Sequence, residues 1–79
     1  NGVAFDPAKN AANKIKHGVF LSDFVGFDAT PTEVVDSRFE YGETRYRAFG
    51  RIGGIGHCLV YVAAGDDMRL ISFRRAHEK

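Results

Sequence analysis

The sequence predicts an α+β domain in which two N-terminal helices pack on a four-stranded antiparallel β-meander. Apolar residues follow a helical spacing up to Thr30-Pro31, and beyond that point they alternate with a period near two. Glycine-rich turn signals separate the later segments, as expected for consecutive hairpins. Because 79 residues suffice for one hydrophobic core only, we expect a single domain over residues 1–79.

Two helices are expected before the sheet. Asp6 and Pro7 form an N-cap and a first helical position, and Gly18 is suited to the left-handed residue that ends a helix, so the first helix is predicted over residues 7–17. A shorter helix begins at Ser22 and ends before Pro31. The residues expected to pack these helices on the sheet are Ala8, Ala12, Ile15, Phe24 and Phe27.

Four strands are expected after Pro31, over residues 32–36, 45–52, 57–64 and 68–75, with turns at Gly53-Gly54 and at residues 65–67. Residues 3–5 are compatible with a short N-terminal edge strand. In the last strand, alternation places Ile71 and Phe73 on the face covered by the helices and Ser72 and Arg74 on the opposite face.

Positive charge is concentrated in the second half of the chain. The net charge is −2 over residues 1–40 and +3 over residues 41–79, where every cation except Lys79 is an arginine. Arg45, Arg47 and Arg51 share one face of a predicted strand, and the planar guanidinium fork matches phosphate geometry. This pattern predicts either a phosphate-binding sheet face or an ordinary solvated one, and the two differ in whether the arginines converge.

Several classes of protein do not fit the composition. No apolar run reaches the ~20 residues of a membrane span, and the N-terminal residues do not resemble a secretory signal. The single cysteine, Cys58, cannot form an internal disulfide, and no histidine, cysteine or carboxylate cluster has the spacing of metal ligands. We therefore expect a cytoplasmic domain that needs no cofactor and no metal.

Two motifs resemble those of a known family. Lys16-His17-Gly18-Val19 forms the first, and the second extends from Arg69 to Ala76 with the pattern Arg-x-Ile-Ser-x-Arg-x-Ala. In this order and spacing they resemble the BrnT toxins of bacterial type II toxin–antitoxin modules, over nearly the whole chain. The resemblance implies a fold similar to RelE-like ribonucleases, RNA cleavage that inhibits translation, and neutralisation by a BrnA-like antitoxin. That antitoxin carries a ribbon-helix-helix part, through which the module contacts DNA.

RNA cleavage without a metal requires a proton acceptor for the 2′-hydroxyl, a proton donor for the leaving oxygen, and cations on the phosphate. His17 can change its protonation near neutral pH, although a histidine in a last helical turn also suits the helix dipole. Glu43 is either a base or an ion-pair partner that orients Arg45. The catalytic residues implied are His17, Glu43, Arg45 and Arg74, and those implied to bind RNA are Lys16, Arg69, Ser72 and Arg75.

The chain departs from the family pattern at Phe39, where relatives often have a histidine after an Asp-x-Arg segment. This departure favours a second hypothesis, in which the chain is a catalytically silent relative that only binds the antitoxin and acts as a co-repressor. A third hypothesis is a protein whose sheet arginines are scattered and solvated.

Overall fold

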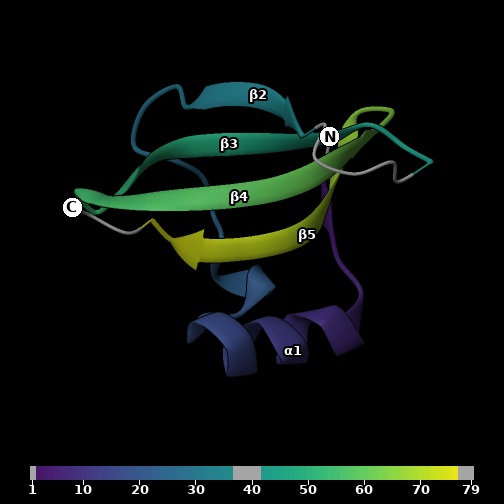
Figure 1. The fold of residues 1–79 in the computed structure, drawn as a ribbon, viewed down its shortest axis with the longest axis horizontal. Coiled ribbons are helices and arrows are strands. Elements are labelled where there is room, and N and C mark those ends of the chain that lie inside the picture. Colours follow the sequence, from purple (N-terminus) through teal and green to yellow (C-terminus); the bar gives the residue numbers. More distant parts are fainter. Residues whose placement is uncertain (1, 37–41, 77–79) are drawn as a thin grey trace.

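The computed structural model describes residues 2–36 and 42–76 (Figure 1). In these two ranges the chain forms one α-helix, one short 3-10 helix and a five-stranded sheet with the order β1-β5-β4-β3-β2. The elements are β1 Val3–Ala4, α1 Pro7–His17, η1 Leu21–Asp23, β2 Thr32–Asp36, β3 Arg45–Ile52, β4 Ile55–Ala64 and β5 Asp67–Arg75. In Figure 1, α1 lies beside β5, at the end of the sheet away from β2.

The first helix begins and ends where the sequence predicts. The Asp6 side chain accepts a hydrogen bond from the Ala8 N–H at 2.8 Å, and Pro7 occupies the first turn, where no backbone donor is needed. Gly18 adopts a φ of 82°, and its N–H donates to the Lys14 carbonyl. A residue with a Cβ is disfavoured in that conformation, so glycine ends the helix here.

The expected second helix is wrong. Only Leu21–Asp23 forms a single 3-10 turn, closed by the Phe20 N–H donating to the Asp23 carboxylate at 2.9 Å. Phe24 is already extended, and Gly26 has a φ of 123°, a value that no α-helix contains. The extended path allows the rings of Phe24 and Phe27 to pack against the core, as expected for these two residues.

The expected four-stranded antiparallel meander is also wrong, because the sheet has a fifth strand and is mixed. β1 pairs in parallel with β5, with Val3 opposite Met68 and the Met68 N–H donating to the Gly2 carbonyl at 2.8 Å. This short strand satisfies backbone groups along part of the outer edge of β5. The other strands follow the predicted ranges closely, and β4 begins at Ile55 because Gly53 and Gly54, at φ values of 60° and 79°, make a two-residue hairpin turn.

A β-bulge in β5 interrupts the predicted alternation at Ile71, whereas Phe73 enters the core and Ser72 and Arg74 lie on the opposite face, as predicted. Val60 pairs with Ser72 and Tyr61 pairs with Leu70, so Ile71 is an extra residue between them. Leu70 and Phe73 therefore both enter the core, and Ile71 does not face the core beside Phe73 as predicted. The bulge also places Arg69 on the same face as Ser72 and Arg74.

α1 packs on β5 through a polar residue and not through the predicted apolar stripe. Ala8 and Ala12 are exposed and Ile15 is 86% exposed, whereas Asn13 is only 5% exposed. The Asn13 amide donates to the carbonyls of Val19 and Phe73, both at 2.7 Å, and its oxygen accepts from the Phe73 N–H at 3.1 Å. β1 pairs with β5 only at Met68 and Arg69. Farther along the same edge of β5, the Asn13 side chain hydrogen-bonds to the Phe73 backbone, as a neighbouring strand would.

The core lies between the sheet and the segment from α1 to Phe27. Phe24 packs edge-on against Phe27 and Phe73, with ring centroids 5.2 and 5.4 Å away. Gly50 in β3 leaves room for the Phe27 ring, since a Cβ on Gly50 would lie 2.7 Å from it. No helix in the described ranges is long and apolar enough to cross a bilayer. The buried core residues are Leu21, Ala48, Leu59, Leu70 and Phe73.

Candidate functional site

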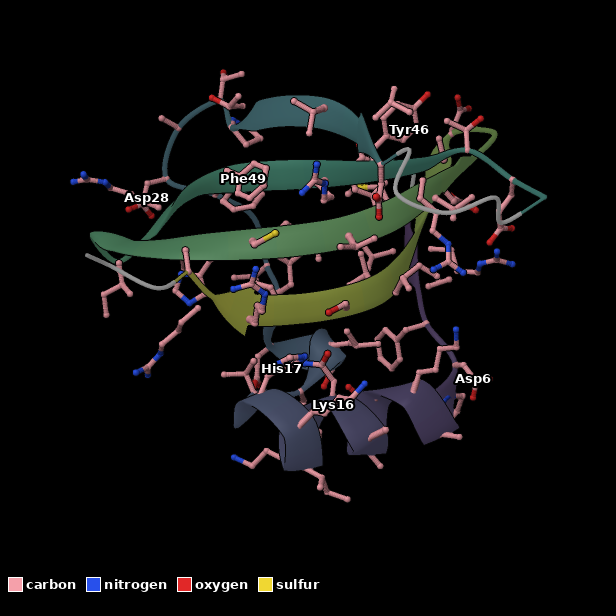
Figure 2. All side chains as sticks on the ribbon, in the orientation of Figure 1. Asp6, Lys16, His17, Asp28, Tyr46 and Phe49 are labelled. Atoms are coloured by element: carbon pink, nitrogen blue, oxygen red, sulfur yellow. The ribbon has the colours of Figure 1, made fainter. Side chains whose placement is uncertain are left out.

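The sheet face opposite the core carries a polar hollow of about 210 Å³. Its floor comes from β4 and the bulge of β5, with Cys58, Val60 and Ile71. We call this side of the sheet the basic face. Figure 2 shows His17 at the end of α1, where the helix borders β5 and the hollow. The polar residues that line the hollow are His17, Asp36, Arg45, Arg47, Ser72 and Arg74.

Strand register explains why these side chains meet. Arg47 pairs with Val60, which pairs with Ser72, so these three residues form one row across the basic face. Arg74 lies in the adjacent row, opposite Cys58. The structure thus brings four predicted site residues into one hollow, namely His17, Arg45, Ser72 and Arg74. These arginines converge, which does not agree with the hypothesis of scattered, solvated arginines.

His17 is held at the rim by the end of α1. Partial burial lowers the pKa of His17 below its ordinary value of 6.5, and the nearby positive charges of Arg74 and Lys16 lower it further. A lowered pKa favours the neutral imidazole, which is the form that can accept a proton. The end of the helix has its own capping contacts, since the Gly18 N–H donates to the Lys14 carbonyl and the Lys14 ammonium donates to the Gly18 carbonyl.

Glu43 lies outside the hollow, in ion pairs with two arginines. One carboxylate oxygen lies 2.7 Å from the Arg69 guanidinium, and the other lies 3.6 Å from the Arg45 Nε. Glu43 is thus an ion-pair partner of Arg45, although 3.6 Å is too long for a hydrogen bond. Arg45 lines the hollow, whereas Glu43 lines a neighbouring one, so the carboxylate offsets part of the Arg45 charge without facing a ligand in the hollow.

The remaining predicted RNA-binding residues occupy different places. Lys16 lines a shallow hollow with His17 and Ser72, next to the first one. Arg69 lies with Glu43, and Arg75 is exposed on the side of β5 opposite Arg74, because neighbouring strand residues alternate. Phe39, where the chain departs from the family pattern, lies outside the described residues.

One carboxylate of the hollow was not singled out from the sequence. Asp36, 4% exposed, pairs across strands with Arg45, and its Oδ1 lies 3.9 Å from the Arg47 Nε. A buried carboxylate needs cationic or hydrogen-bonding partners, and here it neutralises part of the positive charge of the hollow. The alternation of side chains in β2 puts Asp36 and Val34 on the same face of the sheet. Only the pairing of these residues with Arg45 and Arg47 of β3 shows that it is the basic face.

A larger hollow of about 420 Å³ lies on the core side of the sheet, lined by Phe24, Phe27, Pro31 and Met68 among others. Its polar groups are Glu33 and Tyr61, whose hydroxyl donates to the Glu33 carboxylate. Burial and this carboxylate raise the pKa of Tyr61 to about 12. None of the described residues that line it is an arginine or a lysine, so the smaller hollow on the basic face is the better candidate for an anionic ligand.

Comparison with protein families gives one match. The model of a family described as "Ribonuclease toxin, BrnT, of type II toxin-antitoxin system" matches residues 5–79. No curated protein and no solved structure is a significant match. The match begins at Phe5, just before the Asp6 N-cap, and it includes every residue that lines the hollow on the basic face.

Proposed function

The chain belongs to the BrnT family of type II toxin–antitoxin ribonuclease toxins, and from this we propose that it is an endoribonuclease whose active site is the hollow on the basic face. The observation that carries the proposal is the convergence of His17 with three arginines, Arg45, Arg47 and Arg74, in that hollow. Such a set can accept a proton and stabilise a phosphate. The proposed cleavage inhibits translation and needs no metal.

The proposed reaction begins with attack of the RNA 2′-oxygen on the adjacent phosphorus. His17 accepts the proton of the 2′-hydroxyl as the 2′-O–P bond forms and the P–O5′ bond breaks, which leaves a 2′,3′-cyclic phosphate. The 5′-oxygen takes a proton from water, and the hydroxide that remains takes the proton back from His17. Arg45 and Arg74 stabilise the charge that develops on the equatorial phosphate oxygens. An arginine stays protonated throughout, because its pKa exceeds ~12. Glu43 lies 3.6 Å from the Arg45 Nε and Asp36 lies 3.9 Å from the Arg47 Nε, so each carboxylate offsets part of the charge of its guanidinium.

The role of His17 predicts a specific pH dependence. A base must be unprotonated, so the rate should fall as the pH falls through the pKa of His17, which burial and the charges of Arg74 and Lys16 lower from 6.5. The acid limb of the profile should therefore lie below pH 6.5. Single-turnover cleavage of a labelled RNA, from about two pH units below that value to neutrality and above, measures it, and H17A should remove the limb.

If His17 is only structural, H17A should lower the thermal midpoint and leave the shape of the profile intact. A folded wild-type protein that does not cleave RNA would instead support the second hypothesis, a silent relative that binds the antitoxin. The departure at Phe39 favours that hypothesis, and F39H is then the variant to test for a gain of cleavage.

The antitoxin proposed to neutralise this toxin is BrnA-like, and an acidic segment of it covers the basic face. Opposite charges speed the encounter of the two proteins and fix how they sit on one another. Co-expression with the protein encoded beside this chain, followed by affinity capture, should yield a stable complex that does not cleave RNA. R74E should weaken the complex by about tenfold or more, whereas K14E, which makes the same charge change on α1 outside the hollow, should change it little. Equal effects of the two variants would place the antitoxin elsewhere.

A further inference from the structure

We propose that Phe49 is a stacking platform for a base of the RNA substrate, next to the phosphate-binding hollow. The inference rests on the proposed function, since it takes RNA as the ligand of the basic face. Phe49 lies on β3 and is 36% exposed, although it is a large apolar side chain. Figure 2 shows its ring standing on the face of the sheet nearest the viewer, away from α1.

The position of Phe49 ties it to the hollow. Its cross-strand partner on β4 is Cys58, which forms part of the floor, and Cys58 pairs in turn with Arg74. Along β3, Phe49 stands between Arg47 and Arg51 on the same face. The Arg47 guanidinium carbon lies 5.8 Å from the centroid of the Phe49 ring. A nucleotide whose phosphate sits in the hollow would thus have its base within reach of this ring.

The chemistry of this arrangement suits single-stranded RNA. Proteins that bind single strands combine cations on the backbone with aromatic rings on which bases stack, and each stacked base contributes substantially to binding. Strand β3 provides both kinds of side chain in turn, since Arg47, Phe49 and Arg51 alternate as cation, ring and cation along one face. Stacking needs no hydrogen bond to a base edge, so we expect Phe49 to accept any base and to prefer unpaired RNA.

The chain contains no tryptophan, so one introduced tryptophan reports on a single place. F49W should show saturable quenching of its fluorescence by a 2′-O-methyl RNA oligonucleotide, which cannot be cleaved because it lacks the 2′-hydroxyl. F20W is the matched control, since Phe20 is 37% exposed but lies beside Lys14 and does not line the hollow. Its emission should not change at the same RNA concentrations.

Kinetics provide the second readout. F49L should raise KM for RNA cleavage about tenfold with kcat nearly unchanged, because a base stacked equally in the ground and transition states contributes to binding only. F49Y should restore KM. An RNA with an abasic nucleotide at the stacked position should raise the KM of the wild type by the same factor. It should not raise the KM of F49L any further. A thermal midpoint within a few degrees of wild type shows that F49L is folded.

The outcomes separate the two proposals. Cleavage with an unchanged KM in F49L, and no quenching of the F49W fluorescence by saturating RNA, would overturn the stacking site and leave the nuclease intact. Quenching of F49W by RNA without any cleavage by the wild type would overturn the nuclease and keep the stacking site. If the F49W fluorescence responds to the antitoxin and not to RNA, the exposed ring belongs to the antitoxin interface and the proposal is wrong.

Discussion

R74A should slow single-turnover RNA cleavage by about 10²–10³-fold, while RNA binding weakens much less. Arg74 lines the hollow with His17 and Arg45, where the phosphate would lie, and its contribution grows as charge develops in the transition state. R74K should recover only part of the rate, because an ammonium group cannot form the two parallel hydrogen bonds of a guanidinium. Rates at saturating enzyme, with binding measured separately on 2′-O-methyl RNA, distinguish these effects.

The same variant should also change the pH profile. Arg74 is one of the charges that lower the pKa of His17, so R74A should move the acid limb toward higher pH. K14A is the control for the loss of one positive charge, because Lys14 lies on α1 outside the hollow and contacts the Gly18 carbonyl and the Phe20 ring. Equal losses of rate in R74A and K14A would show that only net charge matters, and the proposed role of Arg74 would then be wrong.

N13A should destabilise the fold by about 3 kcal/mol, a large fraction of the stability of so small a domain. The substitution removes three hydrogen bonds, two of them to the backbone of Phe73, and leaves buried donors and acceptors on β5 unpaired. For a domain of this size the thermal midpoint should fall by roughly 12–24 °C. The thermal midpoint of N13L should be no higher than that of N13A, since the apolar leucine side chain cannot hydrogen-bond to the edge of β5.

Asn10 provides the matched control for this prediction. It lies on the same helix, and its side-chain oxygen accepts one hydrogen bond from the Ser22 N–H at 3.0 Å, in an exposed position. N10A should cost no more than about 1 kcal/mol, because water can replace that bond. A thermal midpoint of N13A close to that of N10A would show that Asn13 does not hold α1 to the sheet.

Local chemistry in the sequence was enough to predict α1 and most of the sheet. The bounds of α1 depend on Asp6, Pro7 and Gly18, whose effects act within a few residues, and the structure has the same bounds. Gly53 and Gly54 determine the β3–β4 hairpin for the same reason. The alternation of arginines in β3 correctly indicated that Arg45 and Arg47 share a face, because a period of two is a property of the strand alone.

Features that depend on a distant partner could not be derived in this way. The bulge at Ile71 exists only in the register of β5 against β4, and it decides which residues of β5 enter the core. Asn13 is buried, in place of Ile15, because its amide meets the outer edge of β5, which lies far away in the chain. Asp36 belongs to the site because β2 pairs with β3 in one particular register. Local propensity acts over a few residues, whereas these contacts form only when distant segments meet, so tertiary packing decided them.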